Sequence, residues 1–109
     1  HFFIVRNGEV WTSTGDYCLG GITRANVLRV CREAGIPCFE KNFTLTQVYS
    51  ADEAFTTGTF AGLAPVRAVD GRAIGDGRSL PGPMTERLQT LYQQLVRRDV
   101  ALRAGVRLA

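Results

Sequence analysis

The stretch CLGGITRANVL, residues 18–28, places two adjacent glycines directly before the first turn of an amphipathic helix. Glycine costs a helix about 0.8–1 kcal/mol relative to alanine, so a glycine pair at a helix entrance needs a reason of its own. One reason is a tight loop in which the chain reverses; the other is close approach of backbone N–H groups to an anion. Both readings stay open for this stretch alone, because a glycine loop before a helix is common.

The helix after the glycines is predicted over residues 22–34, where apolar residues share one face and Gly35 follows as a C-cap. Before the glycines, residues 2–6 and 9–12 have the β-branched and aromatic composition of strands. They flank Asn7-Gly8, the dipeptide preferred in two-residue hairpin turns. A polar, glycine-rich loop at 13–21 connects this hairpin to the helix.

Further elements are predicted downstream. Thr44 and Gln47 have capping-box spacing, which predicts a short helix through about Ser50, and Asp70-Gly71 predicts a second hairpin turn. The remaining predictions are a strand at 37–43, a strand at 54–57 that runs into GTFAG at 58–62, hairpin strands at 65–69 and 72–74, a loop at 75–83, a helix marked by Met84, Leu88, Leu91, Tyr92 and Leu95, and a tail at 97–109 that either extends this helix or frays. The pattern predicts a mixed α and β protein without internal repeats.

Composition restricts the class of protein. A chain of 109 residues, 45% of them hydrophobic, suffices for one domain, residues 1–109. The net charge of +3 is spread along the chain, which argues against nucleic-acid binding, and no apolar run approaches a membrane span, so a cytoplasmic location is expected. The cysteines at 18, 31 and 38 have neither CxxC spacing nor nearby histidines, so we expect free thiols and no metal site. Because the chain opens within a strand, we expect a further segment upstream.

A second stretch rich in hydrogen-bond donors is ADEAFTTGTFAGLAPV, residues 51–66, in which a strand ends in a Gly-Thr-x-x-Gly turn. Such a turn presents a hydroxyl and free backbone N–H groups. Two turns of this kind can converge on one anion, and this raises the odds of a phosphate site at the glycine pair.

In this order, and followed by VDGRAIGDGRSLPGPMTERL at 69–88, the motifs resemble the C-terminal domain of the class IV, or fold type IV, pyridoxal-phosphate-dependent enzymes. This group includes branched-chain aminotransferases, D-amino acid aminotransferases and aminodeoxychorismate lyases. The family's Leu-Pro-Gly-Ile-Thr-Arg motif stands here as residues 19–24, with Gly20 in place of proline. The family's ADE-x-F stands at 51–55, its Gly-Thr at 58–59, and its Gly-Pro-x-Thr at 82–85.

The resemblance implies a branched-chain aminotransferase fold, with strands in a pseudo-barrel flanked by helices, and pyridoxal 5'-phosphate as cofactor. The backbone N–H groups of Ile22 and Thr23 and the Thr23 hydroxyl would hold the cofactor phosphate, with Gly21 allowing close approach. Gly58 and Thr59 would also belong to the cofactor site, and Leu19 would pack against the pyridine ring. The residues implied to face the substrate carboxylate are Thr59, Phe60 and Ala61.

The resemblance also implies an activity. The expected reaction transfers an amino group between branched-chain or similar hydrophobic amino acids and 2-oxoglutarate, in a dimer or larger homo-oligomer. Phe60 departs from the small residue usual in branched-chain enzymes, so D-amino acid or amine transaminases and the lyase stay open as alternatives. A non-catalytic module that binds a phosphorylated ligand, or only forms an interface, is the alternative of another class.

No catalytic residue is predicted within this chain. The single lysine, Lys41, does not correspond to the family's catalytic lysine and is interpreted as a solvated strand residue. The lysine that attaches the cofactor, and the acid that pairs with its ring nitrogen, are expected upstream of His1, so the chain alone is predicted to be inactive. The other singled-out residues receive structural interpretations: an untethered terminus for His1, core or rim packing for Trp11 and Tyr17, opposite faces of a strand for Asp52 and Glu53, and a solvated helix face for Arg97, Arg98, Arg103 and Arg107.

Overall fold

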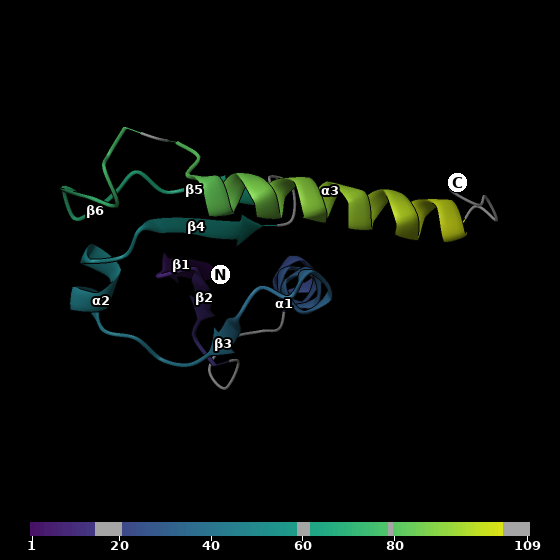
Figure 1. Ribbon diagram of the computed structural model, residues 1–109, viewed down its shortest axis with the longest axis horizontal. Helices are drawn as coiled ribbons and strands as arrows, with labels where there is room; N and C mark the ends of the chain where they lie inside the picture. The colour runs from purple at the N-terminus through teal and green to yellow at the C-terminus, as the bar shows by residue number, and fades with distance from the viewer. Residues whose placement is uncertain (15–20, 59–61, 79, 104–109) are drawn as a thin grey trace.

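The computed structural model describes residues 1–14, 21–58, 62–78 and 80–103, which form a mixed α/β structure (Figure 1). A five-stranded sheet has the order β3-β2-β1-β4-β5, and a separate two-stranded ribbon pairs β6 with β7. The strands are β1 (Phe2–Arg6), β2 (Glu9–Thr12), β3 (Cys38–Glu40), β4 (Glu53–Gly58), β5 (Gly62–Pro65), β6 (Ala68–Val69) and β7 (Arg72–Ala73). The helices are α1 (Ile22–Ala34), α2 (Leu45–Tyr49) and α3 (Pro83–Arg103).

Turn chemistry sets the register of the sheet. Asn7 and Gly8 both have positive φ, 51° and 77°, as a two-residue hairpin turn requires, and they pair Arg6 with Glu9. β1 also pairs antiparallel with β4, while β3 joins β2 in parallel. The hairpin and the helix that begins at residue 22 confirm their predictions.

Two expectations for the strands differ from the structure. The strand predicted at 37–43 pairs only over Cys38–Glu40, and β5 is an additional strand, paired with β4 from Gly58–Gly62 to Phe55–Pro65. The strands predicted to form a pseudo-barrel instead form an open sheet within the described residues, with β3 and β5 at its two edges. Since β3 and β5 do not pair with each other, the sheet stays open over these residues.

Helices cover both faces of the sheet. α1 and α3 pack on one face, where Phe3 and Phe55 stack with ring centroids 4.8 Å apart. α2 packs on the other face through Val48, beside Ile4 and Trp11. Because neighbouring residues of a strand point to opposite faces, Phe3 and Ile4 enter the two different cores.

Helix α3 begins beside Glu53, the first residue of β4. The Glu53 carboxylate accepts hydrogen bonds from the backbone N–H groups of Met84 at 2.9 Å and Thr85 at 2.8 Å. Negative charge at this end complements the helix dipole. The helix then continues through Arg103, so the first part of the tail extends it, and its C-terminal half projects past the sheet (Figure 1).

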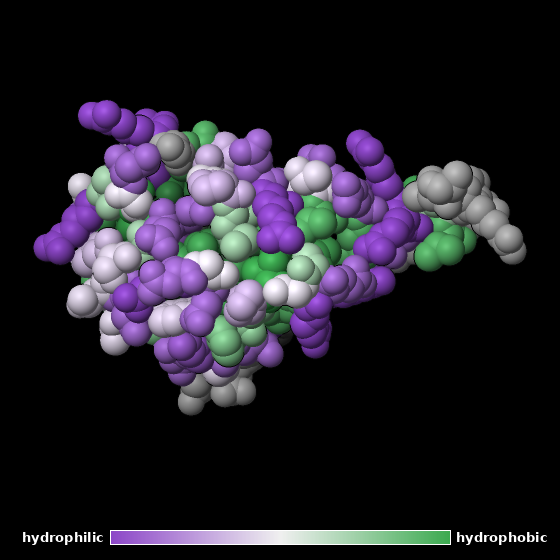
Figure 2. Space-filling model, viewed as in Figure 1, coloured by the Kyte–Doolittle hydropathy of each residue, from purple (hydrophilic) through white to green (hydrophobic). Residues whose placement is uncertain are grey.

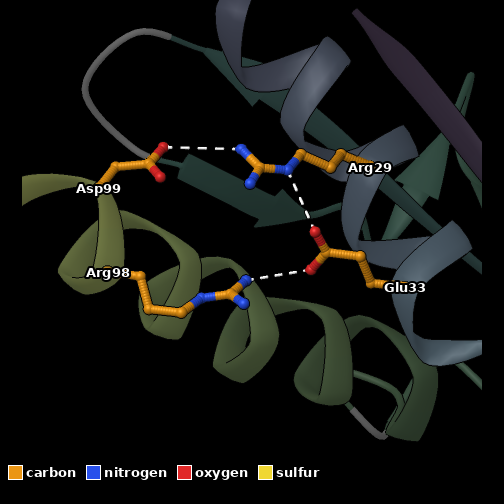
Figure 3. Close-up of polar contacts among 4 residues, drawn as sticks. All are labelled: Arg29, Glu33, Arg98 and Asp99. Carbon is orange, nitrogen blue, oxygen red and sulfur yellow. Dashed lines mark hydrogen bonds and ion pairs between the residues drawn. The ribbon is translucent and has the colours of Figure 1, made fainter. Parts of the chain in front are cut away.

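Ion pairs join α1 to α3 on the surface (Figure 3). Glu33 accepts from Arg29 at 3.1 Å and from Arg98 at 3.0 Å, and Arg29 lies 3.8 Å from Asp99. Hydrophobic side chains show between the two helices in Figure 2, under this charged rim. The network confirms that Arg98 belongs to a solvated helix face.

Candidate functional site

The N-terminus of α1 carries no capping side chain. Its N-cap is Gly21, whose backbone is extended (φ −92°, ψ 140°), and the first turn holds no acidic residue. The first intrahelical bond runs from the Ala25 N–H to the Gly21 carbonyl, so the N–H groups before it have no partner within the helix. With the helix dipole, these N–H groups give the helix end a partial positive charge suited to an anion.

The structure brings together the two stretches that the sequence singled out. The Thr23 hydroxyl on α1 donates to the Gly58 carbonyl at the end of β4, at 3.3 Å. Thr23 is nearly buried, whereas Ile22 is 82% exposed beside it. Gly58 pairs with Gly62, so the paired ends of β4 and β5 lie next to the α1 N-terminus. The two stretches are 35 residues apart in sequence, and only the sheet brings them into contact.

His1 is tethered, contrary to expectation. Its backbone N donates to the Thr57 carbonyl at 3.1 Å, and the Thr57 N–H returns a bond to the His1 carbonyl at 2.9 Å. A Cβ on Gly21 would lie 3.0 Å from His1 Cδ2. The absence of a side chain at Gly21 therefore admits the His1 ring and leaves the entrance of α1 uncovered.

A buried hydroxyl lies next to the site. Thr57, directly before Gly58, is 8% exposed, and its Oγ1 has no hydrogen-bond partner among the described residues. A buried polar atom without a partner costs about 1–3 kcal/mol. Thr57 was not predicted to be functional, and the only signal for it in the sequence is its place in the Thr-Thr-Gly-Thr run.

Arg24 is a second residue that the sequence interpretation missed. It is 8% exposed, and its Nη2 donates to the Ser13 carbonyl and the Glu40 carboxylate, both at 2.8 Å. The guanidinium thus ties the start of the 13–21 loop and β3 to α1.

Lys41 belongs to the opposite face of the sheet. Its Nζ lies 3.6 Å from the centroid of the Trp11 ring, a cation–π contact, and Trp11 belongs to the core under α2 rather than the core under α1. Lys41 is exposed, as predicted, but it lies on an aromatic ring instead of extending into water. Trp11 is 8% exposed, which confirms its packing role.

The acidic pair at 52 and 53 splits as expected. An Asp52 oxygen accepts from the Asn7 N–H at 2.9 Å, whereas Glu53 caps α3.

Cys31 and Cys38 are free thiols. A hydrogen bond with Cys38, together with burial, raises the pKa of Cys31, and the same contact lowers the pKa of Cys38.

Several predicted residues lie outside the described residues: Leu19, Thr59, Phe60, Ala61, Tyr17, Cys18 and Arg107.

A helix N-terminus placed against a glycine-ended strand of a mixed α/β sheet is an arrangement suited to an anion. Residues 2–69 match the family model described as amino-transferase class IV, and the chain belongs to that family. A branched-chain-amino-acid aminotransferase of Pseudomonas aeruginosa is 48% identical over 96 residues, which make up 88% of this chain and 31% of that protein. A D-alanine aminotransferase of Bacillus licheniformis is 42% identical over 83 residues, 76% of this chain and 29% of that protein.

Solved structures agree with this family assignment. A crystal structure of an aminotransferase from Brucella abortus, bound to the cofactor PLP, matches with a TM-score of 0.77 at 34% identity, over 86% of this chain and 32% of that one. The chain therefore spans less than a third of the length of these relatives. Within the described ranges, no helix has the length and hydropathy of a membrane span.

Proposed function

We propose that this chain supplies the cofactor-phosphate and substrate-carboxylate part of a class IV, pyridoxal-phosphate-dependent aminotransferase. The observation that carries the proposal is the Thr23–Gly58 contact, which joins an uncapped helix N-terminus to the second donor-rich turn. Membership in the amino-transferase class IV family supports the same reading. The chain alone is proposed to be inactive, because its single lysine lies on the other face of the sheet.

The donor set fits a phosphate monoester. The Ile22 and Thr23 N–H groups would bind its oxygens, and the Thr23 hydroxyl would turn from the Gly58 carbonyl to a phosphate oxygen. No carboxylate from the first turn of α1 opposes the anion. Leu19, Gly58 and Thr59 would complete the cofactor site, and the backbone of Thr59, Phe60 and Ala61 would bind the substrate carboxylate.

The residues of this chain would bind and orient, and would not transfer the proton at the reacting carbon. Pyridoxal phosphate, when bound, supplies an electron sink for charge that develops at the substrate α-carbon. A phosphate fixed at the α1 N-terminus would set where the cofactor ring lies, and a carboxylate held at the 59–61 turn would orient the α-carbon above it. Positioning of this kind is a major source of rate enhancement.

For the substrate, we propose branched-chain or similar hydrophobic amino acids with 2-oxoglutarate as the partner. The 48% identity to a branched-chain-amino-acid aminotransferase supports this choice. The 42% identity to a D-alanine aminotransferase supports D-amino acids as the second candidate. The homo-oligomeric assembly and the cytoplasmic location stay predictions.

The proposal is tested by titrating the purified chain with pyridoxal 5'-phosphate and with pyridoxal. The expected result is tighter binding of the phosphorylated compound, and a loss of about 10-fold to 100-fold in its affinity for Thr23→Val, because a hydrogen bond to a charged acceptor contributes roughly 1.5–3 kcal/mol. Thr90→Val is the matched control: it removes an exposed hydroxyl that donates within α3 to the Glu86 carbonyl.

Equal affinity for the two compounds would contradict the phosphate site. Borohydride reduction followed by mass spectrometry checks the second part of the proposal. Cofactor fixed specifically at Lys41 would show that the chain holds its own attachment site and would overturn the proposed inactivity.

A further inference from the structure

Tyr92 contacts the candidate phosphate site from α3. Its phenolic oxygen lies 3.5 Å from Thr23 Oγ1, and the position of a Cβ on Gly62 would be 3.5 Å from its Cε1. One turn earlier on α3, Gln89 Nε2 donates to the Leu63 carbonyl of β5 at 3.0 Å. Helix α3 is therefore fixed to β5, and the Tyr92 hydroxyl contacts the hydroxyl of Thr23 on α1.

The Thr23 hydroxyl has one proton and two lone pairs. In the structure its proton is directed to the Gly58 carbonyl, 3.3 Å away. The contact with Tyr92 then has the phenol as donor and Thr23 Oγ1 as acceptor. A phosphate oxygen cannot donate when it is ionised, so it would compete with Gly58 for the Thr23 proton and leave the Tyr92 bond unchanged.

We propose that Tyr92 is a positioning residue of the phosphate site. Its hydroxyl occupies a lone pair of Thr23 Oγ1 and thereby keeps the Thr23 proton available to the phosphate. Its ring, packed against Gly62, sets the distance between α3 and the paired ends of β4 and β5. This inference rests on the proposed function, because it concerns how Thr23 meets the anion.

Tyr92→Phe separates the two roles, because it keeps the ring and removes only the hydroxyl. The purified chain is titrated calorimetrically with pyridoxamine 5'-phosphate and with pyridoxamine, which lacks the phosphate. We expect Tyr92→Phe to weaken binding of the phosphorylated compound by about 3-fold to 10-fold, the range of one neutral hydrogen bond, and to leave pyridoxamine unchanged. Tyr49→Phe is the matched control, since its phenol donates to Asp70 at 3.1 Å on the α2 side.

A double variant gives a readout that a purely structural role would not produce. If Tyr92 acts through the Thr23 hydroxyl, Thr23→Val with Tyr92→Phe binds pyridoxamine 5'-phosphate no more weakly than Thr23→Val alone. Equal losses in both backgrounds, equal losses for both compounds, or no loss for Tyr92→Phe would each overturn the inference. In those cases a Thr23→Val effect leaves the proposed function standing, whereas a wild-type chain with no preference for the phosphorylated compound removes both.

Discussion

Replacing Glu53 tests how α3 is held in place. Its carboxylate accepts two backbone N–H groups at the start of the helix, from Met84 and Thr85, and the helix dipole adds attraction there. Glu53→Gln keeps the volume, removes the charge, and presents an amide NH₂ to one of the two N–H donors. We expect the free energy of unfolding to fall by about 2 kcal/mol, since hydrogen bonds to charged groups contribute roughly 1.5–3 kcal/mol.

The assay is urea denaturation followed by far-UV circular dichroism. Glu86→Gln is the control, because Glu86 lies in the same first turn and shares the helix dipole without capping the backbone. It is expected to cost about 0.3–1 kcal/mol. Equal losses for the two variants would refute the capping argument and leave only a general charge effect.

Gly82→Ala provides a second test of the same contact. A Cβ at residue 82 would lie 2.4 Å from Glu53 Cδ, so the carboxylate must leave the helix end. The loss of stability should approach that of Glu53→Gln. In a Glu53→Ala background the added methyl finds space, and the penalty should largely vanish. Additive losses in the double variant would show that the two residues do not share one interaction.

Gly75→Ala should lower the free energy of unfolding, measured by the same urea denaturation, by more than Gly71→Ala does. Both glycines have positive φ, but only at residue 75 would an added Cβ clash with a backbone atom, the carbonyl oxygen of Asp52. Equal losses would mean that φ alone matters. In the surface network, the hydrogen bond from Arg98 holds the pKa of Glu33 below its ordinary value. The ion pair therefore stabilises the fold fully at a pH above the ordinary pKa of a glutamate, and this stabilisation is lost as the pH falls through the lowered pKa of Glu33. Arg98→Gln should raise the Glu33 pKa in an NMR titration, and Arg97→Gln should leave it unchanged; the reverse order would contradict the ion-pair assignment.

Local signals in the sequence predicted much of the fold. Asn7-Gly8, the Thr44–Gln47 capping box and Gly35 each specify a backbone conformation through their own chemistry, and all three occur as predicted. The strand at Gly62–Pro65 carries no such signal, because its pairing partner lies across a turn and its side chains do not alternate clearly. The predicted pseudo-barrel was wrong for the described strands, because strand order depends on long-range pairing such as that between β1 and β4.

The candidate site shows the same division. The donor chemistry of the glycine pair, Thr23 and the Gly-Thr turn made an anion site one of two open readings, and the family resemblance assigned a phosphate to it. Motif context set Lys41 apart from the predicted site, and the lysine contacts Trp11 on the face of the sheet that α2 covers. The contact of Lys41 with Trp11 and the hydrogen bond from His1 to Thr57 could not be predicted locally, because each depends on how the sheet packs.

The sequence by itself determined the elements, the donors and the family resemblance, because caps, turns and glycines act within a few residues. Only the tertiary structure decided which of these meet. It set Thr23 against Gly58 across 35 residues and directed Tyr92 at Thr23 across 69 residues. It also set Glu53 at the start of α3. Contacts at such separations form when burying the two faces of the sheet fixes where the helices lie, and no local pattern encodes that outcome.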